Sequence, residues 1–240
     1  MAKFRQFLAK PVVTIVLFAL ALGLLSTGTI GGARAVLSEF SSVYESQVST
    51  REIGVTLLEN GKAVSGSKAM LKDFLGDDPQ LLPGKRYTET LAVSNSGRID
   101  QFVRVTVQAY WLDPDGKKAP EMDSKWIKLG FVTNNGWKID ASAQTEERTV
   151  LYYGSVLPVG RTSTPFLDSV TVDGKVAKMV HQTSVTEDGL TTITTTFDYD
   201  GYQLCLCASV DAIQTHNAQE AIKSAWGRNV TVSGDTLSIG

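Results

Sequence analysis

The sequence predicts an all-β protein, an antiparallel β-sandwich of the jelly-roll type that carries one or two short helices. Short runs with apolar residues at every second position recur along the chain and are separated by turn dipeptides such as Asn-Gly and Asp-Gly. Thr, Ser, Val and Gly are prominent, which favours strands and turns over helices. With 240 residues, 42% of them hydrophobic, the chain is long enough to bury one sizeable core.

The stretch from Leu81 to Leu112 shows the alternation most clearly. The apolar row of its second half is Val103, Val105, Val107, Ala109 and Trp111. Tyr87 to Ser94 has apolar residues in the same phase, and Asn95-Ser96-Gly97 between the two runs tolerates the positive φ that a reversal requires. We therefore expect two strands joined as a hairpin at the centre of the fold.

Before this stretch we expect one strand and one short helix. Ile53, Val55 and Leu57 alternate with small residues and predict a first core strand, which ends at the turn Asn60-Gly61. Lys68 to Leu75 has apolar residues at helical spacing and predicts a short helix.

After the central stretch, further strands and turns alternate. Trp126 to Val132 and Trp137 to Ile139 flank Asn134-Asn135-Gly136 and predict a hairpin. Arg148 to Tyr153 predicts another strand. The turn at Glu187-Asp188-Gly189 precedes a Thr-rich strand, Leu190 to Phe197.

The C-terminal part predicts a strand, a helix and a last edge strand. Tyr202 to Ala212 alternates strictly between an apolar and a more polar face. Asn217 as a cap, Glu220 at the capping-box position and Gly227 as a stop delimit the helix. The final strand contains Val230, Val232 and Leu237.

Residues 1–35 have the layout of a secretory signal peptide. Lys3, Arg5 and Lys10 precede an uncharged apolar segment, and Ala33-Arg34-Ala35 fits an A-x-A cleavage site, with Ala33 and Ala35 as its small residues. A retained membrane anchor is the alternative, in which the uncleaved segment is the only contact with a membrane. In both cases the rest of the chain lies outside the cytoplasm.

The charge of the exported part argues against nucleic acid as a partner. Removal of residues 1–35 leaves nineteen basic against 25 acidic residues, and no basic cluster remains. Residues 36–50 then form the N-terminal arm, which is a frayed terminus or a β-prone segment that pairs with another subunit. Residues 51–240 form the sandwich domain.

No residue pattern indicates a catalytic, cofactor or metal site. His181 and His216 do not belong to an H-E-x-x-H helix, and no G-x-S-x-G nucleophile motif is present. The aspartates of Asp113-Pro114-Asp115-Gly116 suit a turn, because no distal glutamate completes a calcium loop. We therefore expect a protein that is not an enzyme and that uses no cofactor.

Cys205 and Cys207 are the only cysteines of the chain. At i and i+2 of a strand they face the same way, with Cα atoms near the outer limit for a disulfide. Free thiols are the first interpretation, and an intermolecular or strained disulfide is the second. One C-x-C pair supplies too few ligands for a zinc site.

Three stretches of the sequence resemble the TasA/camelysin family of secreted Gram-positive proteins. The signal segment ends in GLLSTGTIGGARA, and PGKRYTETLAVSNSGRIDQFVRVTV follows after the arm. The C-terminal stretch Ala208 to Gly227 resembles an end segment of relatives of that family. The resemblance covers most of residues 10–112 and 200–227, and it implies export through an ER-type signal peptidase. The protease activity with which camelysin is classed is not carried over, because no zinc site is recognisable.

The resemblance implies a secreted jelly-roll subunit of extracellular fibres in a biofilm matrix or on the cell surface. Its partners are then further copies of itself, the signal peptidase and other matrix proteins. Such fibres grow by β-strand donation, and the donor residues here are Val36, Leu37, Phe40 and Val43. A monomeric surface module that binds protein or carbohydrate through its loops is the alternative. A secreted hydrolase is a third, which requires His181 or His216 beside carboxylates in a cleft.

Overall fold

The computed structural model describes residues 53–64, 70–71, 74–78, 80–187 and 190–239. The chain divides into two compact units, Met1–Thr50 and Arg51–Gly240, and every described residue belongs to the second. The signal peptide, its cleavage residues Ala33 and Ala35, and the donor residues of the arm lie outside the described residues. No helix within the described part of the chain is long and apolar enough to cross a membrane.

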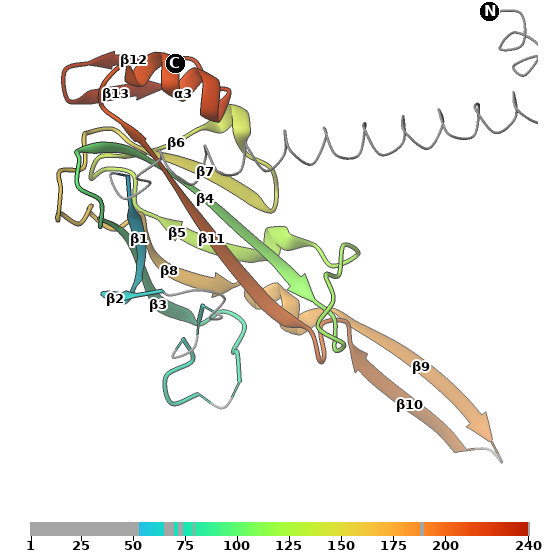
Figure 1. The fold of residues 1–240 in the computed structure, drawn as a ribbon. Coiled ribbons are helices and arrows are strands. Elements are labelled where there is room, and N and C mark those ends of the chain that lie inside the picture. Colours follow the sequence, from blue (N-terminus) through green and yellow to red (C-terminus); the bar gives the residue numbers. More distant parts are fainter. Residues whose placement is uncertain (1–52, 65–69, 72–73, 79, 188–189, 240) are drawn as a thin grey trace, which may run out of the picture. The chain divides into compact units, whose positions relative to one another are not determined.

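Two antiparallel sheets pack face to face (Figure 1). Within the described ranges, the first sheet has the order β2 (Lys62–Ala63), β1 (Val55–Glu59), β3 (Arg86–Asn95), β8 (Leu167–Val172), β5 (Ile127–Phe131). The second has the order β11 (Gln203–Gln214), β4 (Gln101–Leu112), β7 (Arg148–Tyr153), β6 (Trp137–Ile139). Short 3-10 turns lie at Ser124–Trp126, Ala141–Ala143 and Gly174–Lys178. The prediction of an all-β sandwich built from antiparallel sheets is confirmed.

The core lies between the two sheets and is built from the predicted apolar rows. Val103, Val105 and Val107 of β4 are fully buried and belong to one cluster with Leu91 and Val93 of β3. Each such side chain contributes about 1.5–3 kcal/mol when it leaves water. The alternation read from the sequence therefore identifies the buried face of these strands correctly.

The predicted central hairpin is wrong, because β3 and β4 belong to different sheets. The chain crosses from one sheet to the other after Asn95, and none of the residues 95–97 has a positive φ. The Asn95 side chain shapes this crossing: its Nδ2 donates to the carbonyls of Ile99 (2.9 Å) and Leu157 (2.8 Å), and its Oδ1 accepts from Gly97 N. The two apolar rows face each other across the core, and a period of two looks the same for facing and for neighbouring strands.

The predicted hairpin at Asn134-Asn135-Gly136 is wrong for the same reason. β5 pairs with β8, and β6 pairs with β7, so the segment between them also crosses from sheet to sheet. Gly136 does have the expected positive φ of 104°. Trp137 then enters the core fully buried and donates from Nε1 to the carbonyl of Thr164. Burial of this large ring directs β6 to the second sheet.

The predicted short helix at Lys68 to Leu75 is not seen in the residues that are described there. Phe74 and Leu75 lie in a turn, and Leu71 has a φ of 70°, which is not helical. Phe74 is buried against the ring of Tyr87, with 4.8 Å between the ring centroids. The apolar residues described in this segment therefore pack onto the first sheet without forming a helix.

The C-terminal helix is confirmed as α3 (Ala218–Trp226), and Gly227 ends it with a φ of 65°. The capping prediction for Asn217 is wrong: its φ is 52° and its side chain makes no capping hydrogen bond. The predicted last edge strand is instead a two-stranded sheet, β12 (Val230–Ser233) and β13 (Thr236–Ile239). Gly234, with a φ of 56°, supplies the turn between them. α3 and this sheet cover the outer face of the second sheet through a smaller apolar cluster that includes Ile222.

β9 (Val180–Glu187) and β10 (Leu190–Phe197) form a hairpin that extends away from the sandwich (Figure 1). The predicted Thr-rich strand is therefore confirmed, with Glu187 and Leu190 paired beside the predicted turn. Every described residue of the two strands is exposed.

Candidate strand-binding flank

β11 is the edge strand of the second sheet. It pairs with β4 over all of its twelve residues, from Gln203 opposite Leu112 to Gln214 opposite Gln101. Among the described residues, no strand pairs with its other side. A long edge of this kind presents a row of backbone N–H and C=O groups to which another strand can bond.

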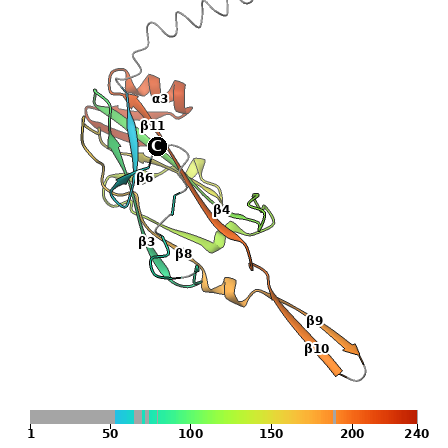
Figure 2. The same ribbon diagram turned by 60° about the horizontal axis from the view of Figure 1, so that its bottom comes forward.

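β1 lies beside β11 near the edge of the first sheet, where only the two-residue strand β2 lies beyond it (Figures 1 and 2). Apolar residues of both strands are only half buried where they pack onto the core between the sheets: Val55, Leu57, Leu204, Ala208 and Val210. We call this side of the sandwich the β1–β11 flank. It combines an open backbone edge with a strip of incompletely covered core, which are the two features that an added strand requires.

The chain enters the sandwich at one end of the β1–β11 flank. The carbonyl of Gly54 accepts from the N–H groups of Ser96 and Gly97, both at 3.0 Å, and from Gln101 Nε2 at 2.7 Å. A Cβ atom at Gly54 would lie 3.1 Å from Gly97 N, so the backbone approaches as closely as glycine allows. The hydrogen bonds of Gly54 therefore fix the start of the described sandwich beside β11.

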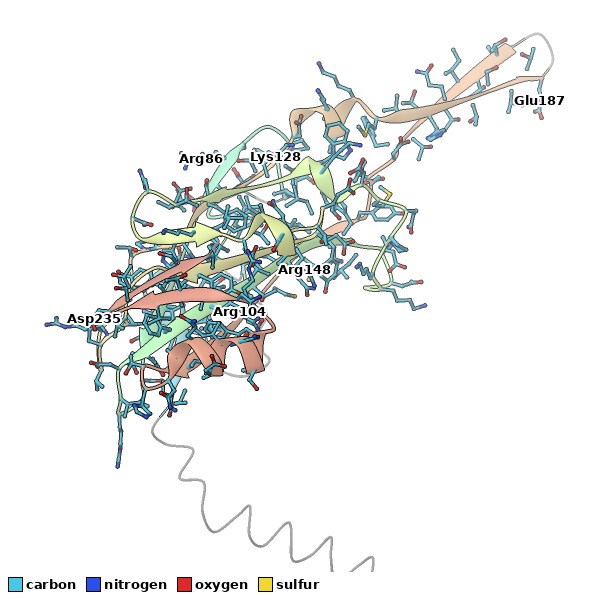
Figure 3. All side chains as sticks on the ribbon, turned by 90° about the horizontal axis from the view of Figure 1, so that it is seen from above. Arg86, Arg104, Lys128, Arg148, Glu187 and Asp235 are labelled. Atoms are coloured by element: carbon cyan, nitrogen blue, oxygen red, sulfur yellow. The ribbon has the colours of Figure 1, made fainter. Side chains whose placement is uncertain are left out.

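β11 has few of the features that protect exposed edges from pairing. It contains neither proline nor lysine, and Asp211 is its only charged residue. Asp211 is paired with Arg104 of β4 at 2.6 Å on the outer face of the sheet, and the Arg104 guanidinium lies 5.0 Å from the centroid of the Trp226 ring. Arg104 and Arg148 both lie on the outer side of the second sheet (Figure 3). The open edge itself therefore carries no charge that would oppose another strand.

Cys205 and Cys207 lie on the outer face of β11. Both are free thiols, which was the first of the two interpretations of the sequence. Their Sγ atoms are 3.6 Å apart, and the Tyr110 hydroxyl is 3.8 Å from Cys207 Sγ. Burial raises the pKa of the Cys205 thiol, which keeps it protonated and poorly reactive at neutral pH. The pair contributes to packing around β11.

The sequence reasoning missed a carboxyl pair, the half-buried Glu59 of β1 and the buried Glu89 of β3. Glu89 is fully buried, and loss of hydration, together with a hydrogen bond to Glu59, raises the pKa of Glu89 to about 7. Asn60 Nδ2 donates to Glu89 Oε2 at 3.2 Å, and Glu59 Oε1 accepts from Leu71 N at 2.6 Å. The sequence does contain a signal for this burial. Glu89 lies midway between Tyr87 and Leu91, so the strand alternation places it on the same core-facing side.

The two histidines are not brought together. His181 lies at the base of the hairpin with Nδ1 at 2.5 Å from Asp198 Oδ1, and His216 follows the opposite end of β11. Across the described ranges, no three His, Cys, Asp or Glu side chains are grouped so that they could hold a metal ion. Asp113 serves a turn: its carbonyl accepts from Gly116 N and its Oδ1 from Lys117 N. The hydrolase alternative gains no support from these residues.

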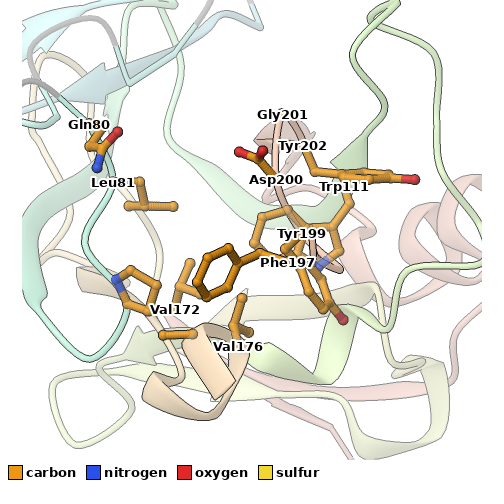
Figure 4. Close-up of a pocket in the computed structure, with 12 residues that line it drawn as sticks. Gln80, Leu81, Trp111, Val172, Val176, Phe197, Tyr199, Asp200, Gly201 and Tyr202 are labelled. Carbon is orange, nitrogen blue, oxygen red and sulfur yellow. The ribbon is translucent and has the colours of Figure 1, made fainter. Parts of the chain in front are cut away.

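A pocket of about 360 Å³ lies where the hairpin leaves the sandwich (Figure 4). Aromatic rings form one side of it: Trp111, Phe197, Tyr199 and Tyr202. Trp111 donates from Nε1 to the carbonyl of Asp123, and its ring meets that of Tyr199 edge-on at 5.0 Å. This pocket is the feature that a loop-based binding module would use.

Within the described residues, the fold and the β1–β11 flank define the class of this protein: an antiparallel β-sandwich in which the long strand β11 forms an open edge. Comparison with protein-family models, with curated proteins and with solved structures finds no match for the chain.

Proposed function

We propose that this protein is a secreted structural subunit of extracellular fibres that assembles by β-strand donation. The observation that carries the proposal is the β1–β11 flank, in which a twelve-residue edge strand borders half-covered core. A strand added there satisfies the free backbone groups of β11 and covers side chains such as Leu57 and Val210. The resemblance of the sequence to the TasA/camelysin family supports the same assignment.

The donor in this proposal is the arm of another copy, with Val36, Leu37, Phe40 and Val43 as its apolar residues. In an extended strand Val36 and Phe40 lie on one face, so they can enter the strip between β1 and β11 together. Signal removal after Ala35 by the ER-type peptidase frees this arm. Since donor and acceptor are different parts of the chain, the contact is head-to-tail and produces a filament when it does not close.

We propose further that the sandwich is a variant of the jelly roll. In support, strands from distant parts of the chain alternate in both sheets: β8 lies between β3 and β5, and β4 lies between β11 and β7. Neighbouring strands that are distant in the chain are a feature of Greek-key and jelly-roll sandwiches. In the proposal, the edge strands depart from the regular arrangement, since β1 pairs with β3 and β6 with β7.

The proposal is tested by electron microscopy of residues 36–240 beside a chain that begins at Thr50, at equal concentration. We expect fibres only when the arm is present. A second test adds a synthetic peptide of residues 36–50 to the shorter chain and measures binding by calorimetry. The matched control is the same peptide with Val36→Glu and Phe40→Glu, which should not bind. If the longer chain stays monomeric and the peptide fails to bind, the proposal is wrong.

A second candidate function rests on the aromatic pocket: a monomeric surface module that binds carbohydrate or protein. The half-buried Tyr202 and the exposed Phe197, beside polar groups such as Asp200, are suited to stacking on a sugar face. Titration of NMR spectra with a panel of oligosaccharides, repeated with Tyr202→Ala, tests it. Shifts that disappear in Tyr202→Ala, in a protein that forms no fibres, would favour this function over the first.

A further inference from the structure

Among the described residues, the β9–β10 hairpin pairs with no other strand. Its two strands pair only with each other, and all sixteen of their residues are exposed. An isolated two-stranded hairpin is at best marginally stable in water. The hairpin nevertheless has a complete register of eight residue pairs, from Val180 opposite Phe197 to Glu187 opposite Leu190. Such an element is stabilised when a further strand joins it.

The composition of the hairpin favours strand pairing. Ten of the sixteen residues in its two strands are Val, Ile or Thr, and neither strand contains proline, glycine, lysine or arginine. β10 carries no charged residue, whereas β9 carries His181 and Glu187. Glu187 lies at the far end of the hairpin (Figure 3). Large apolar side chains are nevertheless exposed, with Leu190 at 72% and Ile193 at 64%. Natural edges usually carry charges or prolines that prevent pairing, and β10 has neither.

The outer edge of β10 is compatible with a second copy of itself. In an antiparallel ladder, the backbone groups of alternate residues bond to one neighbour, so those of every second residue of β10 point away from β9. A two-fold axis perpendicular to the ribbon places a residue opposite its own copy. Centred on Ile193, it pairs Ile193 with Ile193 and Thr191 with Thr195. No pair in this register, or in a register shifted along β10, brings like charges together.

We propose that β10 pairs antiparallel with β10 of a second copy of this chain, so that two hairpins form one four-stranded ribbon. The contact is isologous and closes at two subunits, so by itself it produces dimers and not filaments. It uses neither the arm nor the β1–β11 flank, and it stands independently of strand donation. If the protein forms fibres, this contact links neighbouring fibres side by side. Each contact is weak, but many such contacts along two fibres add up.

Disulfide cross-linking tests the register. The background is residues 36–240 with Cys205→Ser and Cys207→Ser, so that an added cysteine is the only one. Ile193→Cys should form a covalent dimer on mild oxidation. The matched control is Ser184→Cys, which lies opposite Ile193 on the same face of the hairpin but on β9. It should stay monomeric, because two strands separate it from its copy. Cross-linking of Ser184→Cys instead, or of neither variant, overturns the proposal.

Analytical ultracentrifugation tests the dimer without cysteines. The chain that begins at Thr50 should dimerise weakly, and Ile193→Lys should raise the dissociation constant at least tenfold, because it places like charges at the two-fold axis. Ser184→Lys should change it much less. A chain that remains monomeric at the highest concentration examined contradicts the proposal. Fibres of residues 36–240 that persist in Ile193→Lys but no longer associate laterally would separate this contact from strand donation.

Discussion

The β4–β11 pair and the β9–β10 hairpin are both long antiparallel pairs with an unbroken register, yet their surroundings differ completely. One face of the β4–β11 pair is buried in the core, whereas the hairpin is exposed on both faces. Backbone hydrogen bonds alone contribute little net stability, because the unfolded chain bonds to water instead. The comparison teaches that burial of one face stabilises the sandwich strands, and that the hairpin lacks this contribution.

The largest expected effect is that of a charge in the buried row. Val105→Asp places a carboxylate at a fully buried position of β4 and should lower the free energy of unfolding by about 4 kcal/mol or more. Thr194→Asp in the exposed β10 should change it by less than about 0.5 kcal/mol. Urea denaturation monitored by tryptophan fluorescence compares the two variants. Equal effects would show that the hairpin is packed in solution.

Asn95→Ala should have the next largest effect, because it removes the side chain that shapes the crossing between β3 and β4. Asn95 is buried, and its amide bonds to the carbonyls of Ile99 and Leu157 and to Gly97 N. Loss of these bonds leaves buried groups without partners and should cost about 2–3 kcal/mol in the free energy of unfolding. Thermal unfolding followed by circular dichroism measures it. Gln182→Ala in the exposed β9 is the control, and a similar loss there would contradict the comparison.

Glu89→Gln should change how stability depends on pH. The pKa of Glu89 is raised to about 7 in the folded protein from an ordinary value of 4.5, so folding takes up a proton between these values. The stabilising contribution of Glu89 should therefore be fully present below pH 4.5 and should be lost as pH rises through 7. Glutamine resembles the protonated carboxyl, so the variant should be more stable than the parent at pH 8, by on the order of 1–3 kcal/mol.

Glu187→Gln is the matched control for this pH dependence, because Glu187 is exposed in the hairpin. Its melting temperature should follow that of the parent from pH 5 to pH 8. Unfolding curves of all three proteins over this range distinguish the two glutamates. An identical pH profile for Glu89→Gln and the parent would show that the buried carboxyl does not take up the proton.

The smallest effect should follow from removal of the hairpin itself. The chain ends that it leaves are close, because Asp198 N donates to the carbonyl of Met179 at 3.0 Å. Replacement of residues 180–197 by a short Gly-Ser turn should therefore change the free energy of unfolding of the sandwich by less than about 1 kcal/mol. Chemical denaturation checks this value, and a large loss would mean that the hairpin stabilises the fold.

Local patterns identified individual elements well. The apolar rows of β4 and β11, the strand at Arg148 to Tyr153 and the stop of α3 at Gly227 all follow from residues that lie close together in the chain. Each depends on a period of two, a period of 3.6 or a glycine, which short-range sterics impose. Two predictions failed locally, the helix at Lys68 to Leu75 and the cap at Asn217, and the other errors concern strand partners. β3 and β4 were expected to be neighbours, and so were β5 and β6, but both pairs face each other across the core.

The sequence by itself determined which residues of the central strands β3 and β4 face the core, where most strands are interrupted, and that one helix follows β11. Only the tertiary structure decided which strands are neighbours, that β11 is an edge and that the hairpin remains uncovered. The partner of β11 is β4, about a hundred residues earlier in the chain. Such pairings are set when the whole core assembles, because side chains from distant parts of the chain pack into the same buried space. A short segment therefore does not determine which strands become neighbours.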